Sequence, residues 1–271
     1  MKIALYYRHI DEADRMAFDE LTTILHDKGI ATVRVGDGGD LAGCDYLFSI
    51  GGDGTLLSSV QFVGTGSPDT FPPVLGINFG HLGFLTTVGR DNLHSMVEEL
   101  LGGRFTLEER SLLQLSADQS QQPTSFSLNE VFVHRTEEAS LLRTEVYVDN
   151  LYVATYAGDG VIVATPTGST AYSLSCGGPI LTPDSRCLAI TPISAHTLTL
   201  RPIIVPDSAT LRLHVCDDCF LGIDSRRTTL AGNTDLILRR APFSVRLVRM
   251  NTQNFFSAIR DKLMWGTEVR N

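Results

Sequence analysis

The fold is decided by the stretch Asp45-Tyr46-Leu47-Phe48-Ser49-Ile50-Gly51-Gly52-Asp53-Gly54-Thr55. Residues 45–50 predict a strand, and a glycine-rich turn leads from it into a predicted helix from Thr55 to about Val63. Glycines permit close approach of the backbone, and the N-terminus of a helix presents free N–H groups to an anion. The turn matches neither the dinucleotide-binding motif nor the P-loop motif. From the pattern alone, a tight turn closed by Asp53 is as good an interpretation as a phosphate site.

The elements on either side of this turn predict two domains. The first has strands alternating with helices, which favours an open, mostly parallel sheet with helices on both faces. Its predicted strands are 2–7, 31–35 and 73–78, and its predicted helices are 11–28 and 91–101. Short alternating segments follow and predict an all-β sandwich. We therefore expect an α+β protein with an α/β domain at 1–101, a sandwich at 102–250, and a partly helical tail (251–271) that packs back on the first domain.

Charge and composition exclude several classes of protein. The 271 residues carry 31 acidic and 22 basic side chains, a formal charge of −9, which argues against a nucleic-acid or anionic-membrane partner. No apolar run approaches the ~20 residues of a membrane span, and the N-terminus has no apolar signal-peptide core. We expect a cytoplasmic protein. Cys216 and Cys219 form a C-x-x-C pair, but no second pair completes a zinc site.

Three further segments combine glycine, hydroxyl and carboxyl groups. Residues 76–86 leave a predicted strand as a second glycine-rich loop, Asn129-Glu130 interrupts an apolar strand, and residues 158–178 run through Gly-Asp-Gly into a hydroxyl-rich turn. Ligands in an open α/β sheet bind beyond the carboxyl ends of the strands, so the two glycine loops predict one crevice. The alternatives are simple loop punctuation, a solvated strand face, and a capped helix with Tyr172 in the core.

Taken in order, these segments resemble the NAD kinase family of bacterial type. The resemblance rests on Gly51–Thr55, Leu82-Gly83-Phe84, Asn129-Glu130, and Gly158–Gly160 leading into Thr165–Tyr172. His196-Thr197-Leu198 and Arg201-Pro202 also match, so it covers roughly residues 49–249. The first loop alone is also typical of diacylglycerol kinases, sphingosine kinases and phosphofructokinases, whereas the fourth segment is specific.

The resemblance implies transfer of the γ-phosphoryl group of ATP to the 2′-hydroxyl of the adenosine ribose of NAD, forming NADP. It implies a homodimer or homotetramer in which Ser194-Ala195-His196 lies against a neighbour's NAD. Asp53 matches the general base. The implied phosphate loop is Gly51, Gly52, Gly54 and Thr55. The implied NAD contacts are Asp53, Gly54, Phe84, Asn129, Glu130, Asp159, Thr170, Ala171, Tyr172, Ser173, Leu174 and Ser175.

One position departs from the family. Many members carry a nucleotide-contacting Gln where this chain has Arg226, in Asp224-Ser225-Arg226. Arg226 is either one of two solvated arginines in a hairpin or a guanidinium fork for a phosphate of NAD or NADP.

The implied chemistry requires a divalent metal and leaves two rival functions. Lysine occurs only at positions 2, 28 and 262, so no lysine serves either glycine loop. Backbone N–H groups and Mg²⁺ must then carry the charge of the triphosphate, and we expect ATP itself to hold the ion rather than protein ligands. The rivals are a diacylglycerol-type lipid kinase, which shares the first loop, and a non-catalytic NAD-sensing module.

Overall fold

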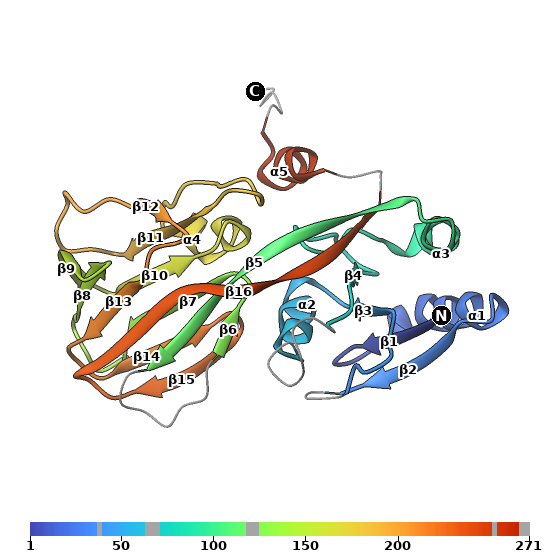
Figure 1. Ribbon diagram of the computed structural model, residues 1–271, viewed down its shortest axis with the longest axis horizontal. Coiled ribbons are helices and arrows are strands. Elements are labelled where there is room, and N and C mark those ends of the chain that lie inside the picture. The colour runs from blue at the N-terminus through green and yellow to red at the C-terminus, as the bar shows by residue number, and fades with distance from the viewer. Residues whose placement is uncertain (37–39, 63–70, 118–124, 251–253, 266–271) are drawn as a thin grey trace. The chain divides into compact units, whose positions relative to one another are not determined.

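The computed structural model describes residues 1–36, 40–62, 71–117, 125–250 and 254–265, without the side chain of Ala117. The chain divides into two compact units, one formed by 1–109 with 245–271 and the other by 110–244 (Figure 1). Both divisions fall inside strands, β5 (Phe105–Ala117) and β16 (Thr234–Met250), whereas the sequence places its boundary at 101–102. Val63 of the predicted second helix and residues 251–253 and 266–271 of the tail lie outside the described residues.

The first unit is built on a parallel sheet. Its strands lie in the order β2-β1-β3-β4, and the C-terminal part of β16 pairs in parallel with β4 through Leu247 and Val74. This arrangement confirms the predicted α/β architecture. The strands are β1 (Lys2–Tyr6), β2 (Ala31–Val35), β3 (Tyr46–Ile50) and β4 (Val74–Ile77), and the helices are α1 (Glu12–Asp27), α2 (Asp53–Val60), α3 (Leu93–Leu101) and α5 (Phe255–Leu263).

Helices cover both faces of this sheet. Alternate residues of a strand point to opposite faces, so Phe48 and Ile50 join the core formed with α1 and α3, while Tyr6 packs edge-on against Phe62 beyond the end of α2. α1 contributes Phe18, Leu21 and Leu25 at helical spacing. Burial on both faces explains why the central strands read as nearly continuous apolar runs.

The second unit is a sandwich of antiparallel strands, as predicted. One sheet carries β13, β8 and β9 beside β16, with β6 paired to β5, and the other runs β12-β11-β10-β7-β14-β15. Inward-facing residues of both sheets fill the core, for example Val131, Val161, Leu213 and Leu236. The strands are β6 (Ser125–Ser127), β7 (Glu130–Arg135), β8 (Leu142–Val148), β9 (Leu151–Gly158), β10 (Gly160–Ala164), β11 (Cys187–Ile193), β12 (Ile203–Pro206), β13 (Leu211–Val215), β14 (Cys219–Ile223) and β15 (Arg226–Leu230).

The differences from the predicted elements have local causes. β12, β14 and β15 are not predicted. β15 is mostly exposed and β12 only half-buried, which removes the apolar alternation that marks a strand, and β14 is a short buried segment interrupted by Gly222. The hydroxyl-rich turn leads into a 3₁₀ turn (Thr167–Thr170) and a single helical turn, α4 (Tyr172–Ser175), rather than into a longer helix. Together they cover the outer face of β7, β10 and β11, where Tyr172 packs on the Ile162 cluster.

Candidate functional site

The first group of site residues lies at the carboxyl ends of β3 and β4 in the first unit. β3 ends at Ile50 and α2 begins at Asp53, so the turn between them is only two residues long. Gly51 adopts a φ of 139°, where a Cβ would collide with the side chain of Thr55, so this position requires glycine. The geometry places the Asp53 carboxyl at the N-terminus of α2, facing the loop that follows β4.

The Asp53 carboxylate is held by that second loop. Oδ2 accepts the N–H of Phe84 at 2.7 Å, while Oδ1 accepts the N–H groups of Leu85 and Thr86 at 3.2 and 3.1 Å. The hydroxyl of Thr86 also donates to Oδ1 at 3.1 Å. Hydrogen bonds to a charged acceptor are stronger than neutral ones, so this carboxylate fixes the two glycine loops against each other.

Gly83 and Arg249 shape the same loop. A Cβ on Gly83 would lie less than 2.5 Å from the Asp53 carboxyl atoms, so the carboxylate occupies the place of the missing side chain. From β16, the guanidinium of Arg249 donates to the carbonyl of Phe84 at 3.1 Å and pairs with Glu108 at 2.8 Å. Sequence reasoning missed Arg249, because its role depends on β16 lying beside β4, a contact distant in sequence.

The second group lies where β7 begins in the second unit. Asn129 and Glu130 are 8% and 6% exposed, and Oδ1 of Asn129 and Oε2 of Glu130 have no hydrogen-bond partner among the described residues. Burial, together with the nearby Asp224 carboxyl, raises the pKa of Glu130 to about 8, although the backbone N–H of Tyr172 opposes the shift. Two buried acceptor atoms without partners are typical of a ligand site, since each costs free energy when left unpaired.

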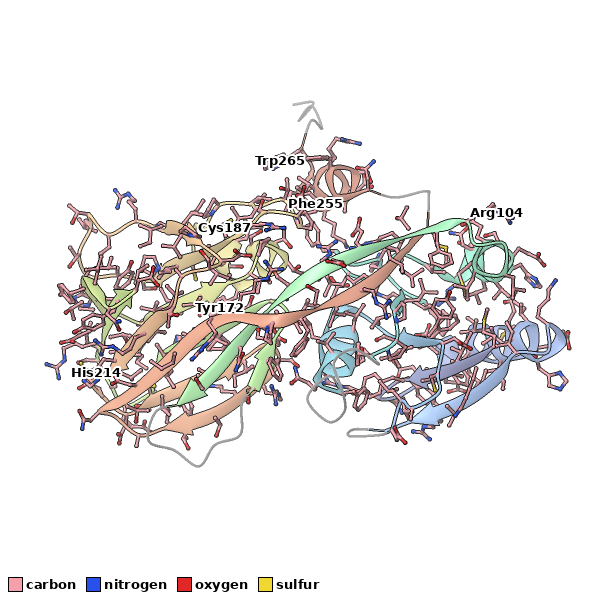
Figure 2. All side chains as sticks on the ribbon, viewed as in Figure 1. Arg104, Tyr172, Cys187, His214, Phe255 and Trp265 are labelled. Carbon is pink, nitrogen blue, oxygen red and sulfur yellow. The ribbon has the colours of Figure 1, made fainter. Side chains whose placement is uncertain are left out.

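The hydroxyl-rich turn supports Asn129 from one side. The hydroxyl of Thr165 donates to the carbonyl of Leu128 at 2.5 Å, and its N–H donates to the carbonyl of Asn129 at 2.9 Å. Gly168 lies so close that a Cβ there would meet the backbone of Asn129. The ring of Tyr172 (Figure 2), in α4, packs edge-on against Phe132 at 5.3 Å between centroids. Asn129 and residues 165–172 are therefore packed directly against each other.

Comparison with known families decides the identity of the chain. A model of the ATP-NAD kinase N-terminal domain matches residues 13–105, and a model of the ATP-NAD kinase C-terminal domain matches residues 128–250. The chain belongs to the ATP-NAD kinase family. It is 40% identical over 233 residues to an NAD kinase of Christiangramia forsetii, covering 84% of this chain and 78% of that protein. It is 42% identical over 229 residues to an NAD kinase of Porphyromonas gingivalis, covering 83% and 78%.

Solved ATP-NAD kinase relatives share the fold. The yeast NADH kinase complexed with NADH superposes with a TM-score of 0.88 at 23% identity, over 100% of this chain and 89% of that one. The NAD kinase of Archaeoglobus fulgidus in complex with ATP gives a TM-score of 0.80 at 22% identity, over 97% and 99%. These likenesses confirm the α/β-plus-sandwich fold. None of the described helices is both long and apolar enough to cross a membrane.

Within this ATP-NAD kinase fold, Asp159 is held by an ion pair. Arg135 Nε donates to its carboxylate at 2.6 Å, and this hydrogen bond, with help from Ser194, holds the pKa of Asp159 below its usual range. Ser194 adopts a φ of 46°, and the N–H of His196 donates to Ala157 at 2.8 Å. The structure thus brings residues 194–196 next to Asp159. Arg135, which pairs with Asp159, is a further residue that sequence reasoning missed.

The remaining sequence candidates differ in exposure. The hydroxyl of Ser173 is buried against that of Thr191 at 2.9 Å, whereas Ser175 and Gly54 are exposed. Arg226 begins β15 with an exposed side chain, and its neighbour Arg227 stacks at 3.6 Å over the ring of Phe220. Thr170, Ala171 and Leu174 are partly buried within the turns of 167–175. No ion pair of Arg226 is found among the described residues.

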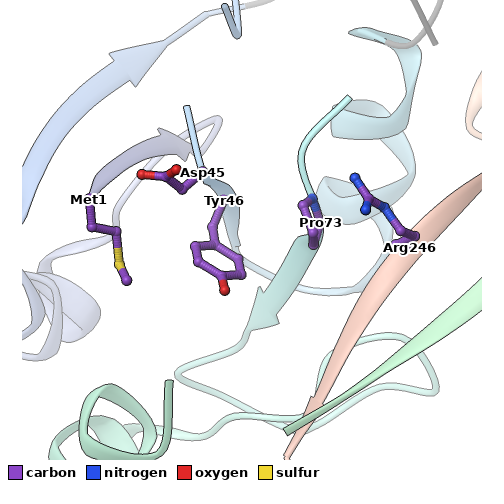
Figure 3. A pocket seen from close by; sticks show the side chains of 5 residues that line it. All are labelled: Met1, Asp45, Tyr46, Pro73 and Arg246. Atoms are coloured by element: carbon purple, nitrogen blue, oxygen red, sulfur yellow. The ribbon is translucent and has the colours of Figure 1, made fainter. Parts of the chain in front are cut away.

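Two further observations concern metal binding and a cavity away from these residues. The described residues contain no group of three or more His, Cys, Asp or Glu side chains placed to hold a metal ion. An open cavity of about 530 Å³ is lined by Met1, Asp45, Tyr46, Pro73 and Arg246 (Figure 3). Met1, Asp45 and Pro73 directly precede β1, β3 and β4, so this cavity lies at the amino ends of the strands, opposite the edge that carries Asp53.

Proposed function

We propose that the chain transfers the γ-phosphoryl group of ATP to the 2′-hydroxyl of the adenosine ribose of NAD, forming NADP, with Asp53 as general base. The observation that carries this assignment is the Asp53 carboxylate. Oδ1 accepts three hydrogen bonds, while Oδ2 accepts one, from Phe84. A carboxylate oxygen has two lone pairs, so Oδ2 keeps one for a hydroxyl proton. A positioned base contributes roughly 10²–10⁴-fold to such a step.

Recognition of the nucleoside rests on Asn129 and Glu130. Each presents a buried oxygen that has no hydrogen-bond partner among the described residues. Oδ1 of Asn129 needs a donor such as a ribose hydroxyl or the adenine amino group, whereas the carboxyl of Glu130, whose pKa is raised to about 8, can donate its proton to a ribose hydroxyl. The half-buried ring of Tyr172 offers a surface against which a base can pack. The further residues we assign to NAD are Gly54, Phe84, Asp159, Thr170, Ala171, Ser173, Leu174, Ser175 and Arg226. For Ser173 the contact must come from its backbone, because its hydroxyl is engaged with Thr191.

We assign binding of the ATP phosphates to the glycine loop and to a divalent metal ion. Gly51, Gly52, Gly54 and Thr55 surround the start of α2, where backbone N–H groups and the helix dipole favour an anion. The Asp53 carboxylate is already surrounded by four donors, which does not suit it as the sole metal ligand. We assign Mg²⁺ to the triphosphate of ATP, where the ion supplies charge neutralisation of the transferring group.

The assembly and location of the protein complete the proposal. A neighbouring subunit would bring its nucleotide to the loop 194–196, so we expect a homodimer or homotetramer in the cytoplasm. Within the chain, Ser194 of this loop hydrogen-bonds Asp159, a residue that we assign to NAD.

One assay tests the function. Purified protein with NAD, ATP and Mg²⁺ should produce NADP, measured by an NADP-specific dehydrogenase. Asp53→Asn should lower kcat at least ~10²-fold while keeping NAD affinity within a few-fold. Label from ATP that appears in an organic-extractable lipid would indicate a lipid kinase instead. NAD binding without ATP turnover would indicate a sensing module, and near-normal turnover of Asp53→Asn would rule out Asp53 as the base.

A further inference from the structure

Asp224 is a buried carboxyl group to which the proposed chemistry gives no role. It lies between β14 and β15 with a φ of 50°, in the left-handed region, and is only 8% exposed. A non-glycine residue in that region is uncommon and carries strain unless its surroundings fix it. The hydrogen bonds of the Asp224 side chain fix this backbone conformation.

The Asp224 side chain is bound by the turn that carries Asn129 and Glu130. Oδ1 accepts the N–H groups of Asn129 and Glu130 at 2.8 and 3.3 Å, and Oδ2 accepts that of Leu128 at 2.9 Å. The hydroxyl of Ser127 lies 2.6 Å from Oδ1. In return, the N–H of Asp224 donates to the carbonyl of Glu130 at 3.0 Å. Three successive N–H groups form a concave anion site, which Asp224 fills from within the chain.

The turn is therefore fully used along its backbone. On the opposite side, Thr165 binds the carbonyls of Leu128 and Asn129. Among the described residues, two buried side-chain oxygens of the turn have no partner, Oδ1 of Asn129 and Oε2 of Glu130. Because a carboxylate already occupies the three N–H groups, a phosphate of the nucleotide cannot bind there, and the turn is left to recognise uncharged groups.

We propose that Asp224 is a positioning residue for nucleoside recognition, which holds the Asn129–Glu130 turn so that both side chains face the sugar and base of the nucleotide. This inference rests on the proposed function, since it assigns those two side chains to NAD. It gives the turn a role in affinity for NAD and none in the binding of ATP or in the transfer step.

Asp224 also acts on the charge of Glu130. Its carboxyl is the charged group that raises the pKa of Glu130 beyond the effect of burial, and the N–H of Tyr172 acts in the opposite direction. Near α4, Arg227 and Asp159 act on the Tyr172 hydroxyl with opposite signs. Replacing Asp224 by a neutral amide therefore lowers the pKa of Glu130.

The test is Asp224→Asn, which keeps the size of the side chain. Its carbonyl oxygen can replace Oδ1, but its NH₂ group then faces the Leu128 N–H, so one accepted bond becomes a donor–donor contact. We expect KM and Kd for NAD to rise roughly 10–100-fold, with kcat within about 3-fold and KM for ATP within about 2-fold. We also expect NAD affinity to depend on the ionisation of Glu130, and this pH dependence should shift to lower pH in the variant.

Asp217→Asn is the matched control. Asp217 accepts the N–H and the guanidinium of Arg143 at the neighbouring hairpin, away from Asn129, so this variant should leave KM for NAD unchanged. If Asp224→Asn does not fold, Ser127→Ala removes one donor to Asp224, and NAD Kd should rise about 3–10-fold. If a folded variant keeps both its affinity for NAD and the pH dependence of that affinity, the inference is overturned. Equal losses of kcat and of affinity for both substrates would overturn it too.

Failure of the proposed function looks different. Wild-type protein that forms no NADP would refute the function itself, whatever Asp224→Asn does. Active wild-type protein in which Asn129→Ala weakens NAD binding, but Asp224→Asn does not, would overturn only the role of Asp224.

Discussion

Gly83→Ala should displace the Asp53 carboxylate without changing its chemical nature. The new Cβ would lie less than 2.5 Å from the Asp53 carboxyl atoms, whereas real Cβ atoms essentially never come within 3.0 Å of a non-bonded heavy atom. Either the carboxylate or the loop must therefore move by well over half an ångström. Such a shift stretches the bond from Phe84, which is 2.7 Å long, and the three bonds to Oδ1. A misplacement of about 1 Å in a catalytic group can cost ~10² in rate, so we expect kcat to fall ~10²-fold.

The assay is NADP formation at saturating NAD and ATP, together with the melting temperature. Gly89→Ala is the matched control, because a Cβ at Gly89, at the end of the same loop, meets nothing within 4 Å. We expect Gly89→Ala to keep kcat within about 2-fold, since a surface substitution away from strained positions has a small effect. A Gly83→Ala enzyme that folds and keeps kcat within about 3-fold of wild type would refute the reasoning, because it would show that the carboxylate need not stay where it is.

Four further predictions follow from the same geometry. Asn129→Ala and Asp159→Ala should each weaken NAD binding by roughly 1–3 kcal/mol, and a raised KM for ATP with unchanged KM for NAD would place them at the donor instead. If the guanidinium of Arg226 binds the 2′-phosphate, Arg226→Gln should raise Ki for NADP and leave KM for NAD unchanged. If it binds the pyrophosphate, the variant should bind both nucleotides more weakly. If neither constant changes, Arg226 is a solvated residue of the hairpin. Because the folded-state pKa of Glu130, about 8, exceeds its ordinary value of 4.5, the native state binds the extra proton, and stability should fall as pH rises from about 4.5 to 8. Glu130→Gln should then raise the melting temperature more at pH 8 than at pH 5, and an equal change at both would contradict the shift. Light scattering at assay concentration should give a multiple of the 29.6 kDa chain, and a fully active monomer would exclude self-association.

The fold could be predicted where the sequence repeats a period. The strands of the first unit and α1 lie within a residue or two of their predicted positions, since burial on both faces leaves long apolar runs between glycine and proline. β5 is predicted only from Leu112, yet it begins at Phe105. The segment 105–110 alternates too weakly to predict a strand, and the pairing with β16, which is distant in sequence, is what extends it.

The candidate site residues could be named from the sequence, but the residues that hold them in place could not. Glycine and hydroxyl patterns marked Asp53, Asn129, Glu130 and Asp159, because those motifs are local. The residues that hold them are distant in sequence and ordinary in type. Arg249 binds the carbonyl of Phe84 from β16, and Arg135 pairs with Asp159. No local pattern distinguishes these two arginines from the others in the chain.

Asp53 in the first unit and Asp224 in the second solve the same physical problem, each within its own unit. A loop that leaves a strand exposes several N–H groups with no strand partner, and each must be paired or solvated. Asp53 pairs with those of Phe84, Leu85 and Thr86, and Asp224 with those of Leu128, Asn129 and Glu130. Each carboxylate thus gives its loop a fixed shape before any nucleotide arrives. Both carboxylates accept three hydrogen bonds at Oδ1 and one at Oδ2, so they differ in access: the Asp53 side chain is partly exposed and can meet a reacting proton, whereas Asp224 is only 8% exposed. The first arrangement suits chemistry and the second suits recognition, which is why substitution of Asp53 should change kcat and substitution of Asp224 should change affinity for NAD.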